Sequence, residues 1–159
     1  MAKVFMLNNT IGTTLILIAT NAYNKYRRVT GGVLDGNTGL LKITPRRYSK
    51  LQSLSFHIQG VCILLWVISA GAIQIPLLFD QVAFELTANA QIWPRNLNSA
   101  IGGASGSIYL IVGDIGSNSG SGLDFVNGQA FLERFYSVYD SGHHRVGLAT
   151  TRFTTATTN

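Results

Sequence analysis

Short apolar stretches separated by turn-forming residues dominate this chain. Some alternate apolar with polar side chains, which predicts half-buried strands, and others are continuous, which predicts buried strands. The segments predicted to be strands are 15–19, 54–58, 82–86, 109–112, 136–139 and 145–149. Several short strands with few helical patterns between them favour a mainly β fold.

The helical patterns are short and isolated. A first helix is predicted from residues 20 to 29, because Thr20 or Asn21 can cap its start and two glycines follow its end. A second is predicted to open at Pro45, since proline is tolerated in the first turn. Residues 131–135 suit one further helical turn.

Composition is that of an ordered domain with little charge. Charged residues make up 12% of the 159 residues, about half the usual share, and 47% are hydrophobic. This excludes disorder and is common among secreted all-β proteins. The single Cys62 cannot form an internal disulfide, and no Cys or His cluster predicts a metal or other cofactor. The Thr-rich tail 150–159 is predicted to be frayed except near Phe153.

Positive charge is concentrated in the first part of the chain. Residues 1–60 hold eight Lys or Arg against the single Asp35, whereas residues 61–159 hold four against six acids. A nucleic-acid-binding patch is one interpretation of the basic runs 25–28 and 42–50. No binding motif accompanies them, so solvated helix faces are favoured and no nucleic-acid partner is expected.

One segment near the end carries a specific motif. It reads LDFVNGQAFLERFYSVYD at 123–140, and RVGLA follows at 145–149. This resembles the closing segment of pepsin-like aspartic proteases, where two apolar residues and a Gly precede Phe-Leu-x-x-Tyr-x-Val-Phe-Asp and Val-Gly-Phe-Ala. Asn127 stands where that family prefers an apolar residue. His143 and His144 replace its usual Asn-Asn and are interpreted as turn surface.

Further stretches are similar to fungal members of the same family. They include GTTL at 12–15 and FELTANAQIWPRNLN at 84–98. Residues 12–60 and 82–159 follow the last part of such an enzyme almost without gaps, whereas residues 1–11 have no counterpart. The resemblance implies the C-terminal lobe of a bilobal acid protease, incomplete because the strands preceding its active-site loop are lacking. It also implies an extracellular location and peptide or protein substrates.

The resemblance places a catalytic aspartate where this chain has none. The family uses two carboxylates that share one proton, each from an Asp-Thr/Ser-Gly loop. Its second loop would read Asp-Thr-Gly-Thr-Thr, but residues 9–14 read NTIGTT. Without a gap, Thr10 occupies the aspartate position; with Ile11 treated as an insertion, Asn9 does. Neither side chain can act as a general base, so no catalytic residue is predicted.

Other loop residues match the family. By resemblance, Gly12, Thr13 and Thr14 line the substrate cleft, and the turn 126–128 packs behind them, although a tight turn and its backing explain these residues equally well. Asp114 begins an Asp-Ile-Gly sequence that mimics the motif. Because isoleucine has no hydroxyl for the hydrogen bond between lobes, Asp114 is interpreted as structural.

An apolar insertion, residues 61–81, separates the two halves of a predicted hairpin. Residues 61–79 carry no charge, which meets the minimum for a membrane span, although Gln74 and Pro76 interrupt the run. A buried core helix is a second interpretation. A third is a retained intron: the first two codons can be written GTATGT and the last CAG, which are fungal splice-site patterns, and removing the segment restores the family register.

The function implied by the resemblance is aspartic-type endopeptidase, with this chain a fragment that is inactive alone. Two other classes remain open. One is a small membrane-anchored β protein that uses residues 61–79 as its span. The other is a non-catalytic interaction module that pairs with a separate N-terminal lobe through exposed sheet edges. The first nine residues do not form a signal peptide, because their apolar run is short and interrupted.

Overall fold

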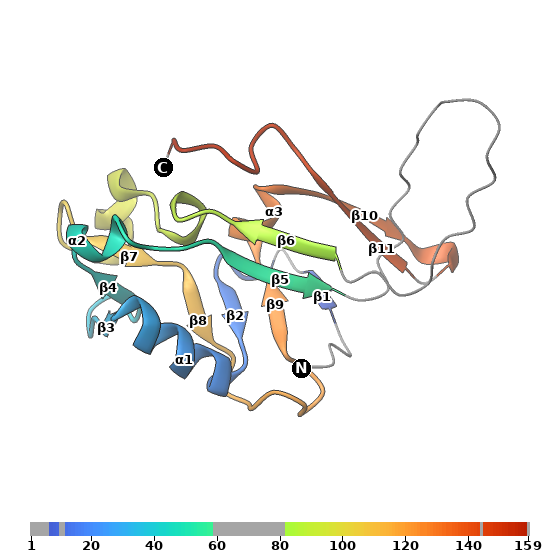
Figure 1. The fold of residues 1–159 in the computed structure, drawn as a ribbon, viewed down its shortest axis with the longest axis horizontal. Helices are drawn as coiled ribbons and strands as arrows, with labels where there is room; N and C mark the ends of the chain where they lie inside the picture. Colours follow the sequence, from blue (N-terminus) through green and yellow to red (C-terminus); the bar gives the residue numbers. More distant parts are fainter. Residues whose placement is uncertain (1–6, 10–11, 59–81, 144, 159) are drawn as a thin grey trace.

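The computed structural model describes residues 7–9, 12–58, 82–143 and 145–158, and it confirms a mainly β fold (Figure 1). The elements in chain order are β1 Leu7–Asn9, β2 Ile16–Ile18, α1 Thr20–Thr30, β3 Val33–Leu34, β4 Leu41–Ile43, α2 Pro45–Tyr48, β5 Leu54–Ile58, β6 Val82–Leu86, η1 Asn89–Gln91, η2 Arg95–Ile101, β7 Ile108–Leu110, β8 Val112–Asp114, β9 Phe125–Asn127, α3 Gln129–Leu132, β10 Phe135–Asp140, η3 Ser141–His143 and β11 Arg145–Thr150.

The described strands form four small sheets. The largest has the order β1-β9-β2-β8, and the others are β3-β4-β7, β5-β6 and β10-β11. In the first sheet β9 lies between β1 and β2, parallel to β1 and antiparallel to β2. The buried run predicted at 109–112 is divided between two sheets, since β7 pairs with β4 and β8 pairs with β2.

The start of α1 differs from the prediction. Ala19 holds the N-cap position and makes no side-chain cap hydrogen bond. The Thr20 hydroxyl instead donates to Asp114 Oδ1 at 2.6 Å, and Asn21 Oδ1 accepts from the Ser119 backbone N–H at 3.0 Å. The two side chains therefore attach the helix to the end of β8 and to the loop that follows it, and these tertiary contacts take the place of local capping.

The third helical turn, predicted at 131–135, lies earlier, because α3 spans Gln129–Leu132 and Phe135, in β10, pairs with Thr150. The end of α1 and the start of α2 follow the prediction. Gly31 ends α1 in the left-handed conformation, with φ of 64°, and its N–H donates to the Arg27 carbonyl. Pro45 opens α2, and Thr44 caps it by accepting from the Arg47 backbone N–H at 3.3 Å.

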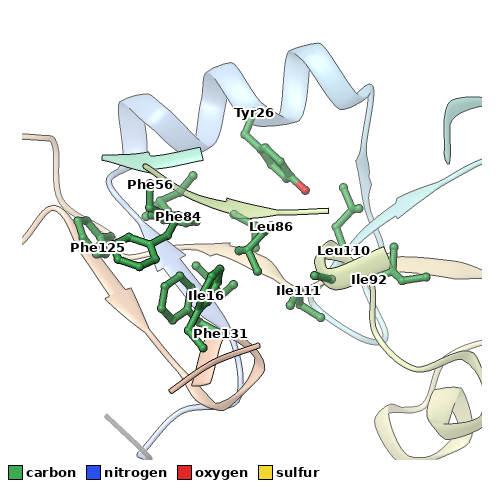
Figure 2. Packing of buried hydrophobic residues seen from close by; sticks show 14 of the residues in the cluster. Ile16, Tyr26, Phe56, Phe84, Leu86, Ile92, Leu110, Ile111, Phe125 and Phe131 are labelled. Carbon is green, nitrogen blue, oxygen red and sulfur yellow. The ribbon is translucent and has the colours of Figure 1, made fainter. Parts of the chain in front are cut away.

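Aromatic side chains from distant segments form the centre of the core (Figure 2). Phe56 lies 5.5 Å from Phe125 and 5.7 Å from Phe131, measured between ring centroids. Phe135 lies 4.6 Å from Phe131 and 5.4 Å from Phe84. Each ring stabilises the fold by about 1.5–3 kcal/mol through burial. The segment with the closing motif is thus a major part of the core.

Strands β5 and β6 form the predicted hairpin. They pair antiparallel over their full length, with Ile58 opposite Val82. The insertion 61–81, and with it each of its three interpretations, lies outside the described residues. Within the described part of the chain, no helix combines the length and apolar character that a membrane crossing requires.

The C-terminal tail contradicts the prediction of fraying. Phe153 is half exposed, whereas its neighbour Thr154 is buried. The buried Arg134 guanidinium donates to the carbonyls of Phe153, at 3.1 Å, and Ala156, at 2.8 Å. In return the Thr154 hydroxyl donates to the Arg134 carbonyl at 2.6 Å. A buried cation needs acceptors, and the tail carbonyls supply them.

Candidate active-site loop

The loop from Gly12 to Leu15 enters β2 and rests on the turn after β9. The backbone N–H of Gln129 donates to the Thr13 carbonyl at 2.9 Å, and that of Ala130 donates to the Thr14 carbonyl at 3.2 Å. The first residues of α3 therefore hold the loop by its main chain. Residues behind the loop were predicted at 126–128, and the contact is confirmed at Gly128, although Val126 and Asn127 belong to strand β9 and not to a turn.

Gly128 makes this close contact sterically feasible. A Cβ at this position would lie under 3.0 Å from the backbone oxygens of Thr13 and Leu15. Backbone atoms cannot move aside as a flexible side chain can, so any other residue would displace the loop or the turn. The glycine of the closing motif is thus explained by packing against this loop.

The predicted cleft residues lie together on this loop. Gly12 and Thr14 are exposed, and Thr13 is half buried. The Thr13 hydroxyl accepts a hydrogen bond from the Leu15 N–H at 3.2 Å, which fixes the turn locally. The exposed side of the loop can therefore contact a ligand, while its buried side is held by α3.

A strand precedes the loop, contrary to the expectation that such strands are lacking. In β1, Leu7 pairs with Phe125 and Asn9 pairs with Asn127, both in parallel register. This strand was not predicted, because asparagine is depleted in strands and the segment is short. Pairing with the free edge of β9 provides its stability. Thr10 and Ile11 lie outside the described residues.

Asn127 is an unusual residue at this position. Its side chain is fully buried in β9, and neither its oxygen nor its nitrogen has a hydrogen-bond partner among the residues that the structure describes. Its Cα lies opposite that of Ile16 on one side and that of Asn9 on the other. Polar side chains are costly in such an environment. Comparison with the family pattern identified Asn127 as a departure. It did not predict that both polar atoms of the side chain would lack a hydrogen-bond partner among the described residues.

A hollow of about 270 Å³ lies beside the exposed end of the loop, and sequence reasoning missed it. Its lining includes Thr14, Trp93 and Leu97, with Glu133 and Arg134 at its polar side. The Trp93 indole N–H is buried and has no hydrogen-bond partner in the described ranges of the chain. These residues come from segments about 120 positions apart in the chain, so no local signal could have grouped them.

The described acidic side chains near these elements have structural partners. Asp114 accepts from the Gly116 N–H at 2.8 Å as well as from Thr20, and Asp124 accepts from the Gly120 N–H at 2.7 Å. His143 lies on the exposed η3 turn with its Nδ1 3.0 Å from Asp140. No group of three or more His, Cys, Asp or Glu within the described residues could hold a metal ion.

A glycine turn packed behind a Gly-Thr-Thr loop, with one strand threaded between the two that flank the loop, defines one lobe of a pepsin-like aspartic protease fold. Polyporopepsin of Irpex lacteus is 58% identical to this chain over 148 residues, which are 93% of this chain and 37% of that relative. The crystal structure of the aspartic proteinase from Irpex lacteus matches with a TM-score of 0.78 at 58% identity.

That structural match covers 94% of this chain and 38% of the solved one, so the chain spans well under half the length of the relatives it matches. No protein-family model matches the chain. At this level of identity the two findings confirm the resemblance to fungal pepsin-like aspartic proteases. They also confirm that the matched part corresponds to a fragment of such an enzyme.

Proposed function

We propose that this chain forms the C-terminal lobe of an extracellular aspartic endopeptidase and contributes residues Gly12, Thr13 and Thr14 to a cleft for peptide or protein substrates. The observation that carries the proposal is the main-chain contact between Gly128 and the loop, within a chain 58% identical to polyporopepsin. This contact fixes a loop whose exposed side chains face outward, as a substrate-lining loop requires.

The same chain is proposed to be inactive alone. Peptide hydrolysis in this class needs two carboxylates that share a proton and activate a water. Position 9 is an amide and position 10 a hydroxyl, and neither can remove a proton from water at acid or neutral pH. The loop can therefore bind and position a substrate without providing the general base.

The sheet β10-β11 supports a second lobe as partner. It extends away from the other sheets (Figure 1), and β10 exposes Tyr136 by 64%, Val138 by 48% and Tyr139 by 58%. Exposed apolar side chains on a two-stranded sheet are a surface suited to association. A separate N-terminal lobe of the same class is the proposed occupant.

The test compares this chain alone with a fusion to the first lobe of polyporopepsin. Pepstatin-inhibited cleavage of haemoglobin is measured at about pH 4, where one carboxyl of such a pair is charged. We expect no cleavage by the chain alone and none by the unmodified fusion. The fusion should gain activity when it carries Asn9→Asp or Thr10→Asp. Asn8→Asp is the matched control. Pepstatin-sensitive turnover proportional to the amount of the unmodified chain would overturn the proposal.

A non-catalytic interaction module is the second candidate function. The absence of a carboxylate at positions 9 and 10, together with the exposed face of β10, favours it. In that case the fusion stays inactive with either aspartate variant, while the chain still co-purifies with a separate first lobe. Tyr136→Ser with Val138→Ser should then abolish co-purification.

We further propose that residues 12–60 and 82–159 form one unit, with 1–11 outside the family match and 61–81 a retained intron. The register of Ile58 opposite Val82 supports a short hairpin connection there. Sequencing the cDNA tests this. Messages that mostly retain the 21 codons would contradict the intron, and carbonate-resistant membrane pelleting would support the membrane-anchored alternative.

A further inference from the structure

A cavity of about 430 Å³ lies between α1 and the segment that joins α2 to β5. Its lining shares no residue with the loop 12–15 or with the hollow beside it. The walls are apolar and come from both sides of the cavity; they include Ile18, Ala22, Val29, Leu51 and Leu54. Val29 is 77% exposed and lies at the outer edge of this apolar lining.

The polar groups at the inner end of the cavity already have hydrogen-bond partners in the protein. Tyr26 reaches from α1 toward the core (Figure 2), and its hydroxyl donates to Gln91 Oε1 at 3.0 Å. The Gln91 amide nitrogen donates in turn to the Gln52 carbonyl at 2.9 Å. Because these buried groups satisfy one another, the inner part of the cavity is suited to an apolar group.

The rim of the cavity is cationic. Lys25, Arg47 and Lys50 line it, and no acidic residue does. Within the described residues the ion pair found is His143 with Asp140, so none of these three cations is neutralised there. Lysine stems can lie along the apolar walls while their ammonium groups remain at the opening. The rim therefore attracts an anion.

Arg47 is fixed in place by the end of α1. Its guanidinium occupies the space that a side chain at residue 31 would need, and Gly31 leaves that space open. One guanidinium nitrogen donates to the Thr30 carbonyl at 3.4 Å. The remaining N–H groups can bind a carboxylate without first ordering the side chain, which favours binding.

We propose that this cavity binds a soluble carboxylic acid with an apolar tail, such as a medium-chain fatty acid. The tail lies against the walls formed by Ile18, Val29 and Leu54, and the carboxylate lies among Lys25, Arg47 and Lys50. This assigns a role to the concentration of positive charge in residues 1–60. It does not rest on the proteolytic function, since no residue of the loop 12–15 lines the cavity.

The direct test uses decanoate below the concentration at which it forms micelles, with binding measured by calorimetry on the full chain. Decanol keeps the tail and removes the charge, and acetate keeps the charge and removes the tail. We expect decanoate to bind about 10-fold more tightly than decanol, and acetate not to bind. Equal binding of decanoate and decanol, or binding of acetate, would overturn the proposal.

Variants locate the binding site. Lys25→Gln with Lys50→Gln should weaken decanoate binding about 5- to 10-fold and reduce its salt dependence. Arg28→Gln with Lys42→Gln removes the same charge outside the cavity lining and should leave binding within about 2-fold. Ala22→Phe should abolish binding by filling the cavity, with circular dichroism and thermal unfolding confirming that the chain is folded.

Two further outcomes contradict the proposal. If Arg28→Gln with Lys42→Gln weakens decanoate binding as much as Lys25→Gln with Lys50→Gln does, the binding depends on net charge and not on the cavity. A filled cavity that still binds decanoate at the parent affinity also excludes this site.

Discussion

Two amide side chains are fully buried within the described part of the chain, and they differ completely in their hydrogen bonds. Gln91 accepts from the Tyr26 hydroxyl, and the two N–H groups of its amide are shared among three carbonyls, those of Gln52, Leu86 and Thr87, at 2.9 to 3.2 Å. Asn127 has no partner for either polar atom among the described residues. Both side chains have 0% exposure, so burial alone does not distinguish a stabilising polar residue from a destabilising one.

The difference follows from where each amide lies. Gln91 is in η1, just after β6 ends, where main-chain carbonyls are released from strand pairing and need donors. Asn127 is in the middle of a sheet, where the main-chain groups of β1, β9 and β2 already pair with one another. A buried polar side chain therefore stabilises the chain where main-chain groups lack strand partners. It lowers stability where the main-chain groups around it already pair with one another.

The largest effect is expected from removing the satisfied amide. Gln91→Leu keeps the volume similar but leaves the Tyr26 hydroxyl and three carbonyls without this partner. We expect the free energy of unfolding to fall by about 3 kcal/mol, as measured by urea denaturation. Gln52→Leu is the control, since its exposed side chain makes only one long hydrogen bond, at 3.4 Å. A loss below about 1 kcal/mol would show that water replaces Gln91.

A somewhat smaller effect is expected behind the candidate loop. Gly128→Ala places a methyl group against the backbone oxygens of Thr13 and Leu15 and should destabilise the chain by about 2 kcal/mol. Gly142→Ala is the matched control, because the nearest atom to its added Cβ lies at 3.6 Å and that change should cost less than about 0.5 kcal/mol. Equal melting temperatures for both variants would contradict close packing of the loop.

The sequence predicted the strands that have a clear apolar pattern, but strands β1, β3, β4 and β9 were not predicted. Alternation at 54–58 and 82–86 predicted both strands of the hairpin, because a half-buried strand leaves a period of two. The run 109–112 was correctly predicted as buried, but burial does not reveal that Ile111 separates two sheets. The binding of the tail by Arg134 depends on positions about 20 residues apart, and the sequence carries no local signal for it.

The candidate site was also predicted only in part. The glycine of the closing motif and the Gly-Thr-Thr loop were found by resemblance, and their contact follows from the family register. Strand β1 could not be predicted, because its stability comes from the edge of β9 and not from its own residues. The cavity under α1 also escaped prediction, since Lys25 and Lys50 become neighbours only after α1 and the segment after α2 have packed together.

Replacing the unsatisfied amide should raise stability. Asn127→Val removes two polar atoms that lack partners, and we expect the free energy of unfolding to increase by about 1–2 kcal/mol. Asn127→Asp has nearly the same shape and should destabilise the chain, because a buried carboxylate is costlier than an amide. Thermal and urea unfolding of both variants measure this. A loss of stability in Asn127→Val would mean that the amide has a partner in solution.

The smallest effect concerns the hydroxyl that contacts Gln91, and its pH dependence appears only at high pH. Burial raises the pKa of Tyr26 well above its ordinary value, so the folded chain keeps this phenol neutral where the unfolded chain loses the proton. The stabilising contribution is complete below the unfolded pKa of about 10 and is lost as pH rises toward the folded value. Stability should therefore fall above about pH 10.

Tyr26→Phe should cost about 1 kcal/mol at pH 7 and flatten this alkaline slope. Burial also raises the pKa of Tyr23, which is half-buried and more accessible, so Tyr23→Phe should flatten the slope less. Urea unfolding of the three proteins from pH 7 to about pH 11 gives the slopes, and a steeper loss in Tyr26→Phe than in the parent would contradict the assignment.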